Sequence, residues 1–129
     1  MSIESAEDLQ GVTEAGRVTT LALDALGAAV AAGVTTAELD AIARGILRAN
    51  GARSAPALVY GFPGSVLISV NDEIVHGVPG RRRLRDGDLV SLDVTVEKNG
   101  YVADAERSVL VGTGSTLAHR LVHAAEQSL

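Results

Sequence analysis

The sequence has 129 residues, of which 47% are hydrophobic, so we expect one folded domain or part of one and exclude a disordered chain. Its net charge of −5 argues against a basic nucleic-acid surface, and the lack of cysteine excludes disulfides and thiolate metal sites. No apolar run approaches the roughly 18 residues of a membrane span, and the acidic start is unlike a secretory signal peptide, so we expect a cytoplasmic protein without membrane contact.

Two helices are predicted at the start of the chain. Residues 5 to about 31 carry apolar side chains at three- and four-residue steps, with acidic residues near the beginning and Gly33 as the stop. The second helix begins at a capping-box pattern, Thr35 followed by Glu38, and ends at Gly51. Its apolar face is formed by Leu39, Ile42, Ala43, Ile46 and Leu47.

The middle of the chain is expected to contain a loop, a strand and a turn. Residues 56–64 hold two prolines and two glycines and are predicted as a loop, and residues 65–70 are predicted as a strand. Residues 81–88, RRRLRDGD, are predicted as a solvated charged turn, with a phosphate or nucleic-acid patch as the alternative.

A hairpin and a last helix complete the predicted elements. The strands LVSLDVTVE and YVADAERSVLV are joined through Asn99-Gly100, a strong hairpin signal. In residues 115–129, leucines and an alanine recur every four positions, which predicts a helix. Helices, strands and a final helix without regular βαβ alternation predict an α+β fold.

Asp93 and Asp104 are candidate metal ligands on that hairpin. A two- or four-residue loop places Thr95 opposite Asp104 and Asp93 opposite Glu106, whereas a three-residue loop would put the aspartates on opposite faces. Aspartates on one face, with backbones roughly 7–8 Å apart, can share two metal ions. Oxygen ligands suit Mn, Co, Fe or Mg, and a nearby histidine adds Zn. The alternatives are solvated or loop-capping aspartates, or Glu106 as the partner of Asp93.

The three histidines give weaker signals. His76 lies in SVNDEIVHGVP at the end of a predicted strand, where a packed or surface role competes with a catalytic one. His119 and His123 are four residues apart on the last predicted helix, as in a zincin, but Arg120 occupies the position of the general-base glutamate. We therefore predict that these two are surface residues.

Several stretches, in this order, resemble type I methionine aminopeptidases. They are AGRV, GVTTAELD, GFPGSVLISVNDEIVHGVP and LRDGDLVSLDVTVEKNGYVADAERSVLVG. The resemblance implies a pita-bread fold of the creatinase and aminopeptidase type, an α+β fold of two halves with a metal-bearing hairpin. It further implies that residues 1–129 are the N-terminal half of such a domain, truncated at Leu129.

The resemblance also implies a function. It implies metal-dependent removal of the N-terminal methionine from nascent polypeptides, with two divalent ions (Co, Mn, Fe or Zn) that activate water. In the family pattern Asp93 and Asp104 are metal ligands, and His76 is a catalytic residue that contacts the substrate amide. Phe62 and Leu67 match positions that shape the pocket for the methionine side chain.

Three further expectations follow from the resemblance. Asn71 matches a position near a monovalent-cation site. One histidine and two glutamate ligands of the family have no counterpart here, so we expect the chain to be inactive alone. Val102 and Ala103 replace the His-Gly pair that usually precedes the second metal aspartate.

Two alternatives remain at this stage. The chain is a short non-catalytic relative that binds a partner or dimerises through an exposed half-fold face, or it is a half-enzyme completed by a second chain.

Overall fold

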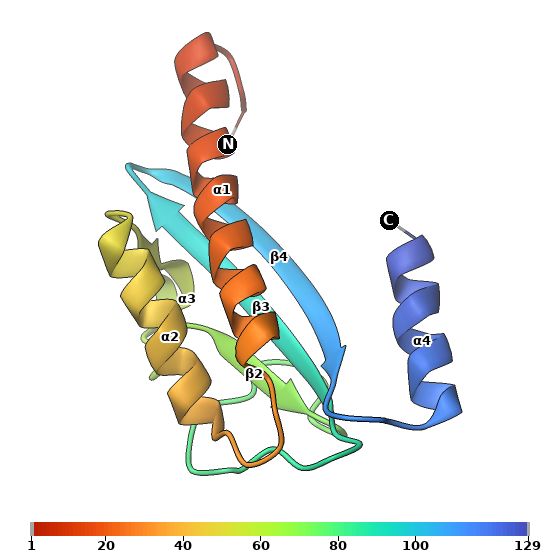
Figure 1. The fold of residues 1–129 in the computed structure, drawn as a ribbon. Coiled ribbons are helices and arrows are strands. Elements are labelled where there is room, and N and C mark those ends of the chain that lie inside the picture. The colour runs from red at the N-terminus through yellow and green to blue at the C-terminus, as the bar shows by residue number, and fades with distance from the viewer. Residues whose placement is uncertain (1, 129) are drawn as a thin grey trace.

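The computed structural model describes residues 2–128 as an antiparallel sheet with two helices packed on one of its faces (Figure 1). The elements in chain order are α1 (Ala6–Ala29), α2 (Thr36–Ala49), β1 (Arg53–Ser54), α3 (Ala55–Tyr60), β2 (Leu67–Val70), β3 (Leu89–Lys98), β4 (Tyr101–Leu110) and α4 (Thr116–Gln127). The predicted truncation at Leu129 lies outside the described residues. Within the described part, no helix combines the length and apolar character needed to cross a membrane.

β3 is the central strand of the sheet. One edge of β3 pairs antiparallel with β4 along its whole length. The other edge pairs antiparallel with β2 in its first half and with β1 in its second half. The hairpin prediction is confirmed: Lys98 pairs with Tyr101 across a two-residue turn in which Asn99 and Gly100 have φ of 52° and 87°. Positive φ at both positions is the geometry that an Asn-Gly turn favours.

The core lies between β3 and the two long helices. Every second side chain of β3 points toward α1 and α2, and each of these is fully buried: Val90, Leu92, Val94 and Val96. They pack with aliphatic side chains of the helices, including Val18, Leu26 and Leu39. Burying each such side chain stabilises the fold by about 1.5–3 kcal/mol. The core is aliphatic, as a chain with only three aromatic residues requires.

Side-chain caps fix the beginnings of both helices. Ser5 accepts a hydrogen bond from the Asp8 backbone N–H at the start of α1. The predicted capping box of α2 is confirmed, because Thr35 and Glu38 each bond the other's backbone N–H. α1 ends at Ala29 rather than at Gly33, and Gly33 instead forms the turn that follows, with φ of 93°.

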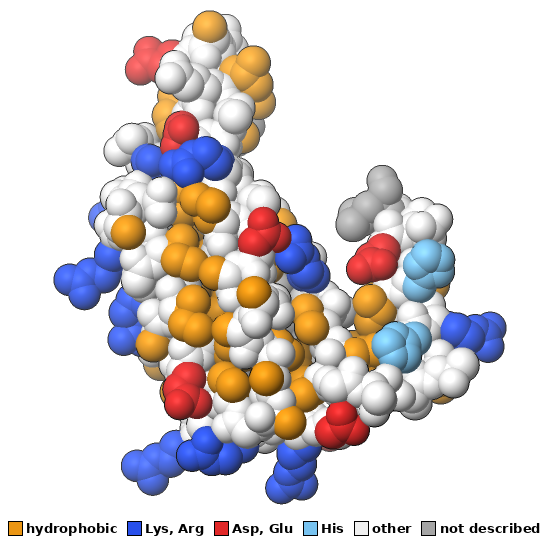
Figure 2. All heavy atoms as spheres, viewed as in Figure 1, with side chains coloured by type: hydrophobic (Ala, Val, Ile, Leu, Met, Phe, Trp, Pro, Cys, Tyr) orange, Lys and Arg blue, Asp and Glu red, His pale blue; other side chains and the backbone are white. Residues whose placement is uncertain are grey.

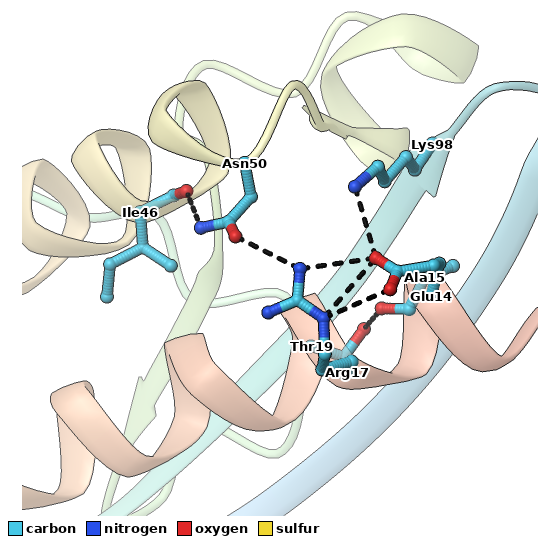
Figure 3. Close-up of polar contacts among 7 residues, drawn as sticks. All are labelled: Glu14, Ala15, Arg17, Thr19, Ile46, Asn50 and Lys98. Carbon is cyan, nitrogen blue, oxygen red and sulfur yellow. Dashed lines mark hydrogen bonds and ion pairs between the residues drawn. The ribbon is translucent and has the colours of Figure 1, made fainter.

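Polar side chains tie α1 to its neighbours (Figure 3). Glu14 accepts hydrogen bonds from Arg17 and from Lys98 at the end of β3. Arg17 also reaches Asn50, the residue that caps α2, at 3.2 Å. These contacts join α1, α2 and β3 outside the apolar core.

A tyrosine packs directly on the backbone of α1 near its beginning. The Tyr101 ring lies where a Cβ atom at Gly11 would be, so no side chain fits at that position. The Tyr101 hydroxyl donates to Asp8 Oδ1 at 3.0 Å. Tyr101 therefore joins the hairpin tip to the first turns of α1.

The predicted loop at residues 56–64 is wrong in its first half, which forms the short helix α3. Ser54 accepts from the Ala57 N–H, Pro56 lies in the first turn, and Gly61 ends the helix with φ of 69°. Proline and glycine thus mark the two ends of a helix here, an arrangement that both residues favour. β1 was not predicted, because its two residues carry no periodic pattern.

α4 stands apart from the rest of the fold (Figure 1). The predicted helix is confirmed, but none of its described residues is buried, and Leu117 and Leu121 are 64% and 56% exposed. His119 and His123 are exposed as predicted, and Figure 2 shows the pale blue histidine side chains of α4 at the surface. His119 Nε2 lies 2.7 Å from the Thr113 carbonyl oxygen.

Candidate active site

Asp93 and Asp104 lie on the sheet face opposite α1 and α2. Asp93 points there because its neighbours on β3, Leu92 and Val94, point into the core. The predicted register is confirmed, with Asp93 opposite Glu106 and Asp104 opposite Thr95. The two aspartates are therefore diagonal neighbours on one face, which they share with Glu106.

Hydrogen bonds satisfy two of these three carboxylates. Thr95 Oγ1 donates to Asp104 Oδ1 at 2.9 Å, and Ser91 donates to Glu106. By contrast, Asp93 Oδ1 is buried and has no hydrogen-bond partner among residues 2–128. A buried oxygen without a donor costs free energy, and such an oxygen calls for an explanation such as an ion.

The electrostatic environment of Asp93 is also unfavourable for its negative charge. Burial, and then the negative charge of Asp104, raise the pKa of Asp93 to about 6. Glu106 acts in the same direction, while His76 lowers the pKa. A cation between Asp93 and Asp104 would relieve both the repulsion and the missing hydrogen bond.

The two aspartates fit a metal ion, but they do not form a complete site. Two carboxylates supply the hard oxygen atoms that divalent ions bind. Within residues 2–128, no group of three or more histidine, aspartate or glutamate side chains is arranged to hold an ion. Asp93 and Asp104 could thus be at most part of a ligand set, and Glu106 does not complete it.

His76 lies near Asp93 on a loop that is fixed to the edge of β2. The next residue, Gly77, accepts a hydrogen bond from the Ile68 N–H at 3.0 Å and donates to Ser69 Oγ at 3.0 Å. A Cβ atom at Gly77 would overlap the Ile68 carbonyl oxygen, so only glycine fits there. His76 itself has a φ of 59°, an uncommon conformation for a residue with a side chain.

Leu67 and Phe62 are the apolar side chains predicted to line a substrate pocket. Leu67 pairs directly with Asp93, so it lies on the same face of the sheet, and it is only 2% exposed. Phe62 is 9% exposed and lies edge-on to Tyr60, with ring centroids 6.3 Å apart. Three exposed apolar residues lie close to His76 in the chain: Ile74, Val75 and Val78.

A buried aspartate on α2 holds the turn that follows Phe62. Asp40 Oδ1 accepts from the backbone N–H groups of Ser65 and Val66 at 2.5 and 3.1 Å, and Arg44 pairs with Oδ2 at 2.5 Å. Asp40 was not predicted from the sequence. The available signal was the Asp40–Arg44 pair, which has the i, i+4 spacing of helical ion pairs.

Asn71 joins the end of β2 to the beginning of β3. Its side chain accepts from the Leu89 N–H at 2.9 Å and donates to Asp88 Oδ1 at 3.0 Å. Its φ of 58° ends the strand. The monovalent-cation site predicted near Asn71 stays a prediction.

The chain matches the model of metallopeptidase family M24 over residues 10–129. A methionine aminopeptidase from Staphylococcus epidermidis is 46% identical over 112 residues, which are 87% of this chain and 45% of that protein. Methionine aminopeptidase 2 of Bacillus subtilis is 36% identical over 99% of this chain and 52% of its own length. The chain thus spans about half the length of the curated relatives it matches.

Solved structures agree with this result. The crystal structure of methionine aminopeptidase from Rickettsia prowazekii matches 99% of the chain with a TM-score of 0.93 and 30% identity, over 52% of that protein. The enzyme from Thermotoga maritima gives a TM-score of 0.95 at 25% identity, also over 52% of its length. Prolidase from Pyrococcus furiosus, at 21% identity and a TM-score of 0.83, shares the fold. These matches confirm the α+β fold and the resemblance predicted from the sequence.

Proposed function

This chain belongs to metallopeptidase family M24, and on that basis we propose that it is the N-terminal half of a methionine aminopeptidase. The proposed reaction is the metal-dependent removal of methionine from the N-terminus of nascent polypeptides. Relatives named for that activity support the proposal, and each is about twice the length of this chain. The remaining metal ligands, a histidine and two glutamates in the family pattern, would come from a second half.

One observation carries the proposal for this chain: Asp93 Oδ1 is buried without a partner and lies beside the negative charge of Asp104. In a protein without an ion this arrangement only destabilises the fold, whereas in a metallopeptidase it is half of a metal site. Asp93 and Asp104 would hold two divalent ions, from among Co, Mn, Fe and Zn. When bound, such ions lower the pKa of water and so provide a nucleophile at neutral pH.

The neighbouring side chains have roles that follow from their positions. His76 would donate a hydrogen bond to the substrate amide and stabilise the negative charge that develops on its oxygen. Leu67, buried beside Asp93, and Phe62 would bind the methionine side chain, whose sulfur makes favourable contacts with aromatic rings. The apolar surroundings of His76 suit the end of an unfolded polypeptide.

Calorimetric titration of the 129-residue chain with Mn²⁺ tests the metal proposal. We expect weak binding, because two ligands without the rest of the set hold an ion poorly, and we expect Asp93→Asn to abolish it. Glu7→Gln removes an exposed carboxylate on α1 and serves as the matched control. Equal binding by Asp93→Asn and the parent chain would contradict the site, and tight stoichiometric binding would contradict its incompleteness.

A second candidate function rests on α4. Its exposed leucines and the outer edge of β4, which has no strand partner within residues 2–128, form a surface that a second copy of this chain could cover. In that case the chain is a dimerisation or binding module. Sedimentation equilibrium tests it: a dimer that dissociates in Leu117→Gln/Leu121→Gln supports this candidate, and a monomer removes it.

A further inference from the structure

The aromatic side chains of this protein are concentrated at His76. The chain has only three aromatic residues, and two of them, Tyr60 and Phe62, lie in one cluster with that histidine. The Tyr60 ring stacks on the His76 imidazole, with centroids 6.1 Å apart and planes 14° apart. Phe62 is buried, but none of the three belongs to the aliphatic cluster between the sheet and the helices.

α3 presents Tyr60 in a fixed place. The helix ends at Tyr60, because Gly61 turns the backbone into the left-handed region and donates its N–H to the Pro56 carbonyl. The Phe62 N–H reaches the same carbonyl oxygen, at 3.3 Å. Phe62 then packs edge-on against Tyr60 from its buried position. The Tyr60 ring therefore contacts Phe62 edge-on and stacks on the His76 imidazole.

His76 has a fixed backbone, and its ring stacks on Tyr60. Gly77 anchors the adjacent backbone to β2, and the φ of 59° sets the direction in which the side chain leaves it. The imidazole is exposed, and within residues 2–128 it has no hydrogen-bond partner. The stacked Tyr60 ring is therefore in a position to limit how the imidazole rotates.

We propose that Tyr60 is a positioning residue, which holds the His76 imidazole toward Asp93 by aromatic stacking. The significance of this for catalysis rests on the proposed function, in which His76 contacts the substrate. Offset stacking between aromatic rings shifts the population of one rotamer by roughly two- to tenfold. Tyr60 is 55% exposed, so its ring contributes little to the core.

Aromatic ¹H–¹³C NMR spectra of the 129-residue chain test the proposal without an activity assay. The chain has three histidines, and His76→Gln identifies the signals of His76. We expect cross-relaxation between the Tyr60 and His76 rings. In Tyr60→Leu we expect the His76 ring signals to move toward those of an unrestrained histidine, while the signals of His119 and His123 stay unchanged.

Two further variants separate positioning from a structural effect. Tyr60→Phe keeps the ring and should retain the parent His76 signals, and Val59→Ala, at an 80% exposed neighbour, should do the same. Unchanged His76 signals in Tyr60→Leu would overturn the proposal. So would changes spread over all three histidines, because they would show that Tyr60 supports the whole fold. The His76 signals are measured without metal. This test can therefore succeed or fail whatever the outcome of the metal titration that tests the proposed function.

Discussion

The two faces of β3 differ in what their side chains do for the protein. On the face covered by helices, Leu92 and Val94 are fully buried among aliphatic neighbours and stabilise the fold. On the other face, Asp93 keeps a buried oxygen without a partner beside a second carboxylate. Alternate residues of one strand thus build the core on one side and the proposed metal site on the other.

Removing a side chain from the covered face should have the largest effect. We expect Leu92→Ala to lower the free energy of unfolding by about 2–5 kcal/mol, because it leaves a cavity in the core. Urea denaturation measures the loss. Ser91 precedes Leu92 and lies on the other face of β3. We expect Ser91→Ala to lower the free energy of unfolding far less, and similar losses for the two variants would refute the difference between the faces.

Gly77→Ala should have an intermediate effect, at the edge of the uncovered face. The new Cβ would overlap the Ile68 carbonyl oxygen, so the loop must move away from β2. We expect a loss of about 1–3 kcal/mol, together with altered NMR signals of His76. Gly80→Ala, where the nearest atom lies 3.9 Å from the added Cβ, is the matched control, and an equal loss there would contradict the explanation.

Replacing Asp93 should act in the opposite direction. In the metal-free protein its pKa is about 6, against an ordinary value of 3.8, so the folded state holds the proton more tightly than the unfolded state. The stability from this group is therefore complete below about pH 4 and is lost as the pH rises to about 6. Since the carboxyl is partly exposed, we expect a loss on the order of 1 kcal/mol.

The measurement is the free energy of unfolding at pH 4 and pH 7 in the presence of a chelator. Asp93→Asn should remove most of this pH dependence and be more stable than the parent chain at pH 7. An Asp93→Asn variant that is less stable at pH 7 would show that this face also contributes to folding.

We expect the smallest change in stability from substitutions on α4, because none of its described residues is buried. Leu121→Gln should change the free energy of unfolding of a monomer by less than about 0.5 kcal/mol, because the side chain is 56% exposed. Thermal denaturation at two protein concentrations checks this. A larger loss that grows with concentration would mean that a second copy covers α4.

Local patterns in the sequence predicted one part of this structure well. Asn99-Gly100 fixed the hairpin register, and with it the side-by-side placement of Asp93 and Asp104. Thr35 and Glu38 likewise marked the start of α2. The hairpin turn and the capping box could both be predicted because each is formed by residues close together in the chain.

Features that depend on contacts between distant residues were not predictable. The stacking of Tyr60 on His76 joins residues 16 positions apart through a helix that the prolines and glycines concealed. The anchoring of Ser65 by Asp40 likewise requires α2 to be packed first. The raised pKa of Asp93 comes mainly from its burial. The alternation of polar and apolar residues along β3 predicts burial for the apolar side chains only, so the burial of Asp93 was not predicted.

We expect the contact between Gly11 and Tyr101 to link changes at two positions that lie 90 residues apart in the chain. Glycine inside a helix is normally a residue that alanine improves. Here the alanine side chain would collide with the Tyr101 ring. We therefore expect Gly11→Ala to be destabilising unless Tyr101 is first replaced by a smaller residue. Among related sequences, a larger residue at one position should occur with a smaller residue at the other. The order of the two changes then decides whether a lineage can make either of them.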